Sequence, residues 1–123
     1  MKTKILLVED DQMIRELYVS EFTSAGYEVA ACTTGEEALK QLREGHFDIM
    51  LLDIMMPGIN GLEVLKAIKE DGRFEALKVI LLTNLGSEMV IKQGFELGAV
   101  GYLIKSSYNP DQIVQEVRKI IGV

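Results

Sequence analysis

Short apolar runs alternate with longer segments of helical periodicity along all 123 residues, and this alternation leaves few possible architectures. Buried strands are predicted near residues 4–8, 27–31, 49–53, 79–83 and 100–104. Runs this short and this apolar are typical of strands covered on both faces, and alternation with helices is typical of a parallel sheet. The sequence therefore predicts an α/β domain: a doubly wound five-stranded parallel sheet with helices on both faces.

Helices are predicted over residues 12–25, 34–44, 62–69, 87–97 and from 110 to the end. The first carries apolar residues at intervals of three and four, namely Ile14, Leu17, Tyr18, Phe22 and Ala25. Thr34 and Glu37 have capping-box spacing, and Asn109 followed by Pro110 is a helix start. For five such units the usual strand order is 2-1-3-4-5, with ligands bound at the carboxyl edge where the order reverses.

Polar groups follow four of the apolar runs: Glu9 and Asp10, Asp53, Thr83, and Lys105. Neighbouring parallel strands lie roughly 5 Å apart, and Mg²⁺ takes oxygen ligands at about 2.1 Å, so one ion can bridge acids from two strands. Carboxylates, a divalent ion, a hydroxyl and an ammonium group are the components of a phosphoryl-transfer site. Asp53 is central and is the natural nucleophile.

Composition excludes several functions. A net charge of −6 opposes direct nucleic-acid binding. Every apolar run is far shorter than the ~20 residues that cross a bilayer, so we expect no membrane association and a cytoplasmic protein. Cys32 is the only cysteine, which rules out an internal disulfide, and we interpret both Cys32 and His46 as structural residues.

Four segments together resemble the receiver domain of two-component response regulators. They are Val8-Glu-Asp-Asp11, Leu52-Asp-Ile-Met-Met-Pro-Gly58, Leu82-Thr83 and Gly98-Ala-Val-Gly-Tyr-Leu-Ile-Lys105, in matching order and spacing. The resemblance covers essentially the whole chain, and implies that residues 1–123 form a single receiver domain. It also implies a flavodoxin-like fold and transfer of a phosphoryl group from a histidine kinase or phosphotransfer protein to an aspartate.

The resemblance assigns a role to each candidate residue. Asp53 would be the phosphoacceptor, and Asp10, Asp53 and the backbone carbonyl of Met55 would bind Mg²⁺. Glu9 would contribute through a bound water. The remaining site residues would be Thr83 and Lys105, which contact the phosphoryl oxygens, and Tyr102, an aromatic switch whose rotamer follows Thr83.

The chain departs from the family pattern in several places. Ser106 replaces the proline that usually follows the lysine through a cis bond, and a cis bond here costs roughly 2.5–4 kcal/mol, so we expect a trans or strained peptide. Asn84 replaces a small residue and is expected to slow small phosphodonors. Met55 and Leu85 are expected to shield a phosphoaspartate from water and lengthen its lifetime.

The expected output surface also differs. Val100 and Gly101 stand where many DNA-binding members carry an acidic pair used for dimerisation. We therefore expect an unknown downstream protein to dock on the face formed by residues 87–97, 100–104 and the last helix.

Competing functions remain at this point. The preferred one is a phosphoacceptor that catalyses its own phosphorylation and dephosphorylation but is not a conventional enzyme. A degenerate receiver would bind partners without phosphorylation. A phosphohydrolase would need a second acid two positions after its nucleophile, where this chain has Met55, and a flavin-binding domain would need phosphate donors where Glu9 and Asp10 stand.

Overall fold

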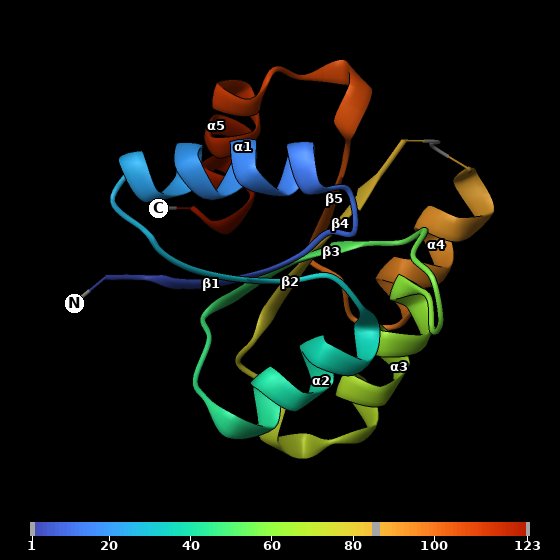
Figure 1. The fold of residues 1–123 in the computed structure, drawn as a ribbon. Coiled ribbons are helices and arrows are strands. Elements are labelled where there is room, and N and C mark those ends of the chain that lie inside the picture. The colour runs from blue at the N-terminus through green and yellow to red at the C-terminus, as the bar shows by residue number, and fades with distance from the viewer. Residues whose placement is uncertain (1, 85–86, 123) are drawn as a thin grey trace.

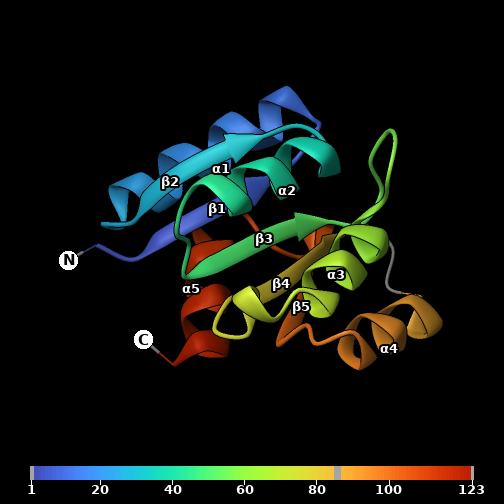
Figure 2. The same cartoon turned by 90° about the horizontal axis from the view of Figure 1, so that it is seen from below.

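A parallel five-stranded sheet forms the centre of the molecule in the computed structural model, which describes residues 2–84 and 87–122. The strands are β1 (Lys4–Val8), β2 (Glu28–Cys32), β3 (Ile49–Asp53), β4 (Lys78–Thr83) and β5 (Gly101–Ile104). Their order across the sheet is β2-β1-β3-β4-β5, as Figure 2 shows, and all neighbouring pairs are parallel. This order confirms the predicted doubly wound fold.

Helices cover both faces of the sheet (Figure 1). On one face lie α1 (Gln12–Ser24) and α5 (Pro110–Ile121), and on the other lie α2 (Gly35–Glu44), α3 (Gly61–Glu70) and α4 (Glu88–Glu96). Two short 3₁₀ segments are η1 (Gly72–Phe74) and η2 (Lys105–Ser107). None of the helices in the described ranges has the length and apolar character that a membrane-spanning helix requires.

Alternating strand residues form two hydrophobic cores. In β1, Ile5 and Leu7 face α1 and α5, whereas Leu6 and Val8 face the layer of α2 and α3. Successive strand side chains point to opposite faces, so a strand between two helical layers must be apolar at every position. The resulting burial fixes the strand register, and therefore fixes which polar residues emerge together at the carboxyl edge.

Capping residues set where the helices begin. Asp11 accepts a hydrogen bond from the Ile14 amide at 3.1 Å, which starts α1 directly after the acidic end of β1. Thr34 accepts from the Glu37 amide at 3.1 Å, and the Glu37 carboxylate accepts from the Thr33 hydroxyl at 2.8 Å. The predicted capping box at α2 thus closes through a neighbouring hydroxyl group.

Several boundaries and faces differ from the prediction. The strand β2 begins one residue late, α4 begins at Glu88, and Val100 precedes β5. Leu17, placed by periodicity in the buried stripe of α1, is 47% exposed. The apolar stripe of α1 is wider than the surface that contacts the sheet. Leu17 lies at the edge of this stripe and is therefore exposed to solvent.

Candidate functional site

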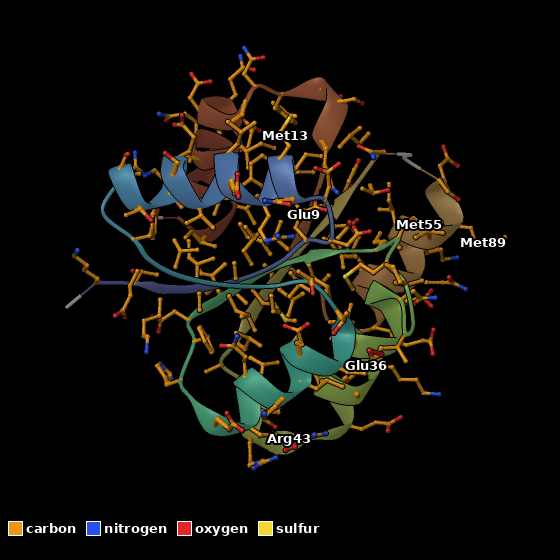
Figure 3. All side chains as sticks on the ribbon, viewed as in Figure 1. Glu9, Met13, Glu36, Arg43, Met55 and Met89 are labelled. Carbon is orange, nitrogen blue, oxygen red and sulfur yellow. The ribbon has the colours of Figure 1, made fainter. Side chains whose placement is uncertain are left out.

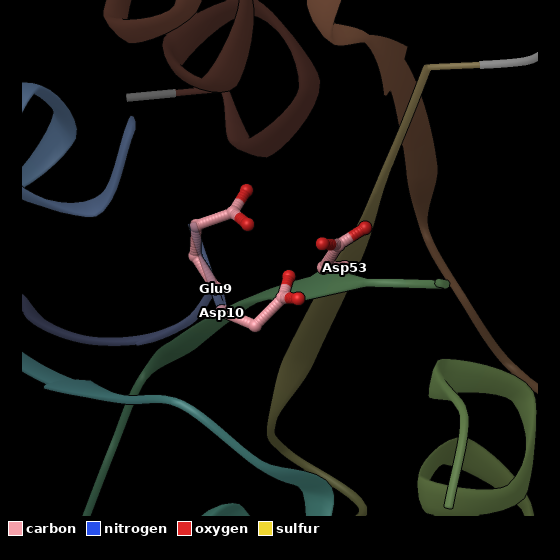
Figure 4. A group of neighbouring side chains, drawn as sticks. All are labelled: Glu9, Asp10 and Asp53. Atoms are coloured by element: carbon pink, nitrogen blue, oxygen red, sulfur yellow. The ribbon is translucent and has the colours of Figure 1, made fainter. Parts of the chain in front are cut away.

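A pocket of about 360 Å³ opens at the carboxyl edge of the sheet, between the ends of β1, β3 and β5. Figure 4 shows Glu9 and Asp10 following β1 and Asp53 at the end of β3, with the Asp10 and Asp53 carboxylates facing one another. The pocket is lined by Glu9, Asp10, Asp11, Ile14, Asp53, Met55, Asn84 and Lys105. The structure thus brings together most of the residues that the sequence indicated.

The three acids fit a divalent cation. One ligand atom from each of Glu9, Asp10 and Asp53 lies within 4.8 Å of the others. Oxygen ligands at about 2.1 Å from a Mg²⁺ ion lie roughly 3 to 4 Å apart, so a small closure of these carboxylates would suffice. Glu9 and Asp53 are buried, and Asp10 is exposed at the pocket mouth. A hard cation would find oxygen donors here and an open side for water or phosphate oxygens.

Lys105 reaches the acids from the edge of the sheet. Its ammonium group donates to Asp53 Oδ2 at 3.0 Å and also forms a short ion pair with Glu9 Oε1. Lys105 is only 8% exposed, and its peptide bond to Ser106 is trans. The predicted reach of the lysine across β4 is therefore confirmed without proline at the next position.

Burial and charge change the acidity of this group of residues. Burial raises the pKa of the Asp53 carboxyl to about 7, although the Lys105 ammonium opposes that rise and the Glu9 carboxylate reinforces it. Burial alone would lower the pKa of Lys105, but hydrogen bonding to Glu9 and the charge of Asp53 together raise it above its usual value. Lys105 is thus the cation that compensates the buried acids.

The loop after β1 is held by a residue that sequence reasoning missed. Arg15 Nη1 donates to the backbone carbonyls of Glu9 at 3.1 Å and Asp10 at 3.4 Å. The Asp11 amide donates to Glu9 Oε2 at 3.1 Å. These bonds fix the backbone from which both acids project. The one sequence feature that could have indicated this contact is that Arg15 lies one turn into α1, close to the loop after β1.

The loop from β3 to α3 is held close to Asp53. The Met55 amide donates to Asp53 Oδ1 at 3.3 Å, and the Gly61 amide donates to the Ile54 carbonyl at 2.9 Å. A Cβ atom on Gly61 would lie 2.5 Å from the Asp53 carbonyl oxygen, so only glycine permits this approach. The Met55 side chain is 74% exposed and lines the pocket.

Thr83 and Tyr102 lie at different depths. Thr83 is buried at the end of β4, and the following residue, Asn84, lines the pocket. Leu85, the other predicted shield, lies outside the described residues. Tyr102 is 38% exposed, and its ring packs edge-on against Phe95 of α4 with centroids 6.1 Å apart. Tyr102 is therefore directed outward against α4.

One acid and one thiol that were expected to play no part in the site, Asp48 and Cys32, do not line the pocket. Asp48 sits before β3 at the opposite edge of the sheet, where it accepts from the Lys4 amide at 2.9 Å and contacts His46. Cys32 is buried, and burial raises the pKa of its thiol to about 12. A thiol held this strongly protonated is a poor nucleophile, which supports a packing role.

Comparison with known proteins agrees with this fold. The family model "Response regulator receiver domain" matches residues 5–118. The chain therefore belongs to the response regulator receiver family, the signalling phosphoacceptors of two-component systems.

Curated relatives include the transcriptional regulatory protein ResD of Bacillus subtilis, which is 36% identical over 120 residues. The transcriptional regulatory protein CpxR of Escherichia coli is 39% identical over 118 residues. These alignments cover 98% and 96% of this chain but 48% and 49% of the relatives. The chain thus spans about half the length of these relatives.

Solved structures match over nearly the whole chain. The chemotaxis response regulator CheY4 of Vibrio cholerae has a TM-score of 0.90 and 29% identity, with 98% of this chain and 99% of that chain covered. The response regulator TrrA of Thermotoga maritima, solved with Mg²⁺ and BeF, has a TM-score of 0.82 and 39% identity over the same shares. Both similarities support a receiver fold.

Proposed function

We propose that residues 1–123 form a single receiver domain that takes a phosphoryl group from a histidine kinase or phosphotransfer protein onto Asp53. The observation that carries this proposal is the position of the Asp53 carboxylate, between the acidic cluster and the Lys105 ammonium 3.0 Å away. The domain would work in the cytoplasm, where kinases draw on ATP, and would contact no membrane.

The chain's own residues would carry out the transfer. An Asp53 carboxylate oxygen attacks phosphorus and forms the acyl phosphate, while the bond from phosphorus to the donor histidine nitrogen breaks and its electron pair stays on the nitrogen. Lys105 and the Thr83 hydroxyl contact the phosphoryl oxygens and offset their charge. Self-catalysed hydrolysis later returns the carboxylate.

Asp10, Asp53 and the backbone carbonyl of Met55 would hold Mg²⁺, and Glu9 would act through a bound water. Support comes from the oxygen donor set at the pocket, which a hard cation prefers. When bound, the ion neutralises charge on the phosphoryl oxygens. Glu9 is also paired with Lys105, so it links the metal-binding acids to the lysine.

Phosphorylation would be transmitted from Thr83 to Tyr102 and the outer face of α4, β5 and α5. Support comes from exposed apolar side chains on these elements, among them those of Phe95, Val100 and Tyr102. An unknown downstream protein would dock there after Tyr102 changes rotamer. Val100→Asp is expected to weaken that docking.

The relatives' names place them in transcriptional regulation. We propose that the 123 residues of this chain do not contact nucleic acid themselves, since their net charge is −6. Any transcriptional output would pass through a partner or an additional domain. A degenerate receiver gains no support, because Lys105 reaches Asp53 despite Ser106. Met55 also lies where a phosphohydrolase would need its second acid.

Intact-mass spectrometry tests the proposal. The chain is incubated with Mg²⁺ and either acetyl phosphate or a phosphorylated histidine kinase. We expect the mass of one phosphoryl group to be added, and to be lost in Asp53→Asn or with EDTA. Asp48→Asn is the matched control, because this acid flanks the same strand at the opposite edge and should leave uptake unchanged. Absence of the added mass with both donors would rule out a phosphoacceptor.

A further inference from the structure

One acidic side chain outside the pocket contacts the loop that carries Met55. Glu36 lies in the first turn of α2, and its Oε1 accepts a hydrogen bond from the Ile59 amide at 3.2 Å. The two residues are 23 positions apart in the sequence. Glu36 and Met55 lie on the same side of the molecule in Figure 3. Glu36 is exposed, so this contact contributes little to the core.

The loop is shaped to receive this carboxylate. Gly58 has a φ of +78°, a conformation that favours glycine, and a Cβ atom there would lie 2.9 Å from Glu36 Oε1. Gly35 is crowded by side chains, because a Cβ atom there would lie 2.6 Å from Ile59 Cγ1 and from Val64 Cγ2. Glycines on both sides of the contact thus leave room for the start of α2 to pack against the loop and α3.

The two limbs of the loop are held by different partners. The limb leaving β3 is held by the bond from the Met55 amide to Asp53, and the bond from the Gly61 amide to the Ile54 carbonyl closes the base of the loop. The returning limb is hydrogen-bonded to Glu36 at the Ile59 amide. The Met55 carbonyl belongs to the segment between the Met55 and Ile59 amides, and this segment is hydrogen-bonded at both ends.

The neighbouring Glu37 behaves differently, although it lies in the same helical turn. Its carboxylate accepts hydrogen bonds from the Thr33 and Thr34 hydroxyls at 2.8 and 3.5 Å, which stabilises the start of α2 itself. The chain thus presents two adjacent glutamates with equal charge, one bonded to the loop and one bonded to its own helix.

We propose that Glu36 is a positioning residue for the magnesium site, and that it acts by holding the β3–α3 loop through the Ile59 amide. The inference rests on the proposed function, because it concerns the loop carbonyl of Met55 as a Mg²⁺ ligand. Loss of the hydrogen bond between Glu36 and the Ile59 amide would let the loop adopt other conformations. Metal binding would then weaken although every metal ligand is still present.

A Mg²⁺ titration followed by amide NMR tests this role in three variants. Glu36→Ala removes the acceptor, and we expect Mg²⁺ binding to weaken roughly fivefold, which corresponds to one hydrogen bond of about 1 kcal/mol. Glu36→Gln keeps an acceptor oxygen and should bind within about twofold of wild type, by the same scale. Glu37→Ala is the matched control with the same loss of charge, and it too should stay within about twofold.

Hydrogen exchange of the Ile59 amide in EDTA gives a readout independent of the metal, and it should speed up only in Glu36→Ala. Equal weakening in all three variants would mean that charge is responsible, which would overturn positioning. Normal wild-type binding with unchanged Glu36→Ala affinity would overturn this inference alone. A wild-type chain that binds no Mg²⁺ would overturn the proposed function as well.

Discussion

The Lys105 ammonium lies 3.0 Å from Asp53 Oδ2, although Lys105 directly follows β5, Asp53 ends β3, and β4 lies between these two strands. The same ammonium pairs with Glu9, which directly follows β1, so one buried cation joins acids at the ends of two strands. In the absence of a metal ion, this pairing is what makes two buried carboxylates tolerable.

Lys105→Met should therefore destabilise the metal-free protein by roughly 3 kcal/mol, because it leaves the acids uncompensated. Mg²⁺ should restore much of that loss by supplying positive charge. Urea unfolding in EDTA and in Mg²⁺ measures both effects. Lys119→Met is the matched control: Lys119 pairs with Glu116 at 3.0 Å on the surface, and its loss should change stability by less than about 1 kcal/mol. Equal effects of the two variants would contradict the central role of Lys105.

The raised pKa of Asp53 predicts how stability changes with pH. In metal-free protein this pKa is about 7, against an ordinary value of 3.8. Between these values the folded state keeps a proton that the unfolded state releases, so the contribution of Asp53 to stability falls as pH rises through this window. Between pH 5 and pH 8, wild type should lose roughly 1–3 kcal/mol more than Asp53→Asn.

Urea unfolding in EDTA at the two pH values measures this difference. Asp48→Asn serves as the control, because the hydrogen bond from the Lys4 amide lowers the pKa of Asp48, which is then ionised at both pH values. Parallel pH dependence in wild type and Asp53→Asn would show that Asp53 ionises normally.

Met55 should limit access of water to a phosphorylated Asp53. Its side chain lines the pocket, and hydrolysis of an acyl phosphate needs an aligned water. Met55→Asn should therefore accelerate loss of the phosphoryl group, by roughly threefold or more, since a polar side chain can hydrogen-bond that water. Intact mass followed over time gives the rate. Met89→Asn changes an equally exposed methionine on α4 and should leave the rate unaltered. An unchanged rate in Met55→Asn would count against shielding.

A side chain at Gly61 should destabilise the folded protein. An alanine Cβ atom would lie 2.5 Å from the Asp53 carbonyl oxygen, so β3 or α3 would have to shift. We expect Gly61→Ala to cost roughly 1–3 kcal/mol of stability, as overpacking typically does. In Gly72→Ala the new Cβ atom would meet nothing within 4 Å, so stability should hold or rise by about 0.4–1 kcal/mol. Thermal unfolding compares the two variants, and similar melting temperatures would disprove the steric argument.

The fold and most of the pocket followed from local patterns in the sequence. Strand burial is encoded in short apolar runs, and parallel pairing brings their carboxyl ends to one edge. For that reason the amino-acid sequence alone was enough to predict that Asp10, Asp53 and Lys105 share one site. The pair between Glu9 and Lys105 could not be predicted, because it depends on side-chain directions at strand ends and not on spacing.

The close approaches between backbone segments could not be predicted from the sequence either. A glycine at the start of a helix indicates a turn, but Gly61 is required because its Cα lies close to the Asp53 carbonyl, and only the packed structure defines that approach. Arg15 and Glu36 bind backbone atoms of other segments, and nothing in the identity of those segments indicates the contact. Leu17 was misplaced because periodicity locates a helical face but not the edge of its contact.

The anchoring of α4 differs from that of α5 in a way that matters for signalling. Within α4, whose residues all lie in the described part of the chain, only Gly94 is buried, and its absent Cβ atom would lie 2.3 Å from Leu81 Cδ1. By contrast, α5 buries Ile113, Val114, Val117 and Ile121. Burying an aliphatic side chain contributes about 1.5–3 kcal/mol, so separating α4 from the sheet costs several kcal/mol less than separating α5. A displacement of α4 would therefore cost less free energy than a displacement of α5, which makes α4 the more adaptable of these two helices.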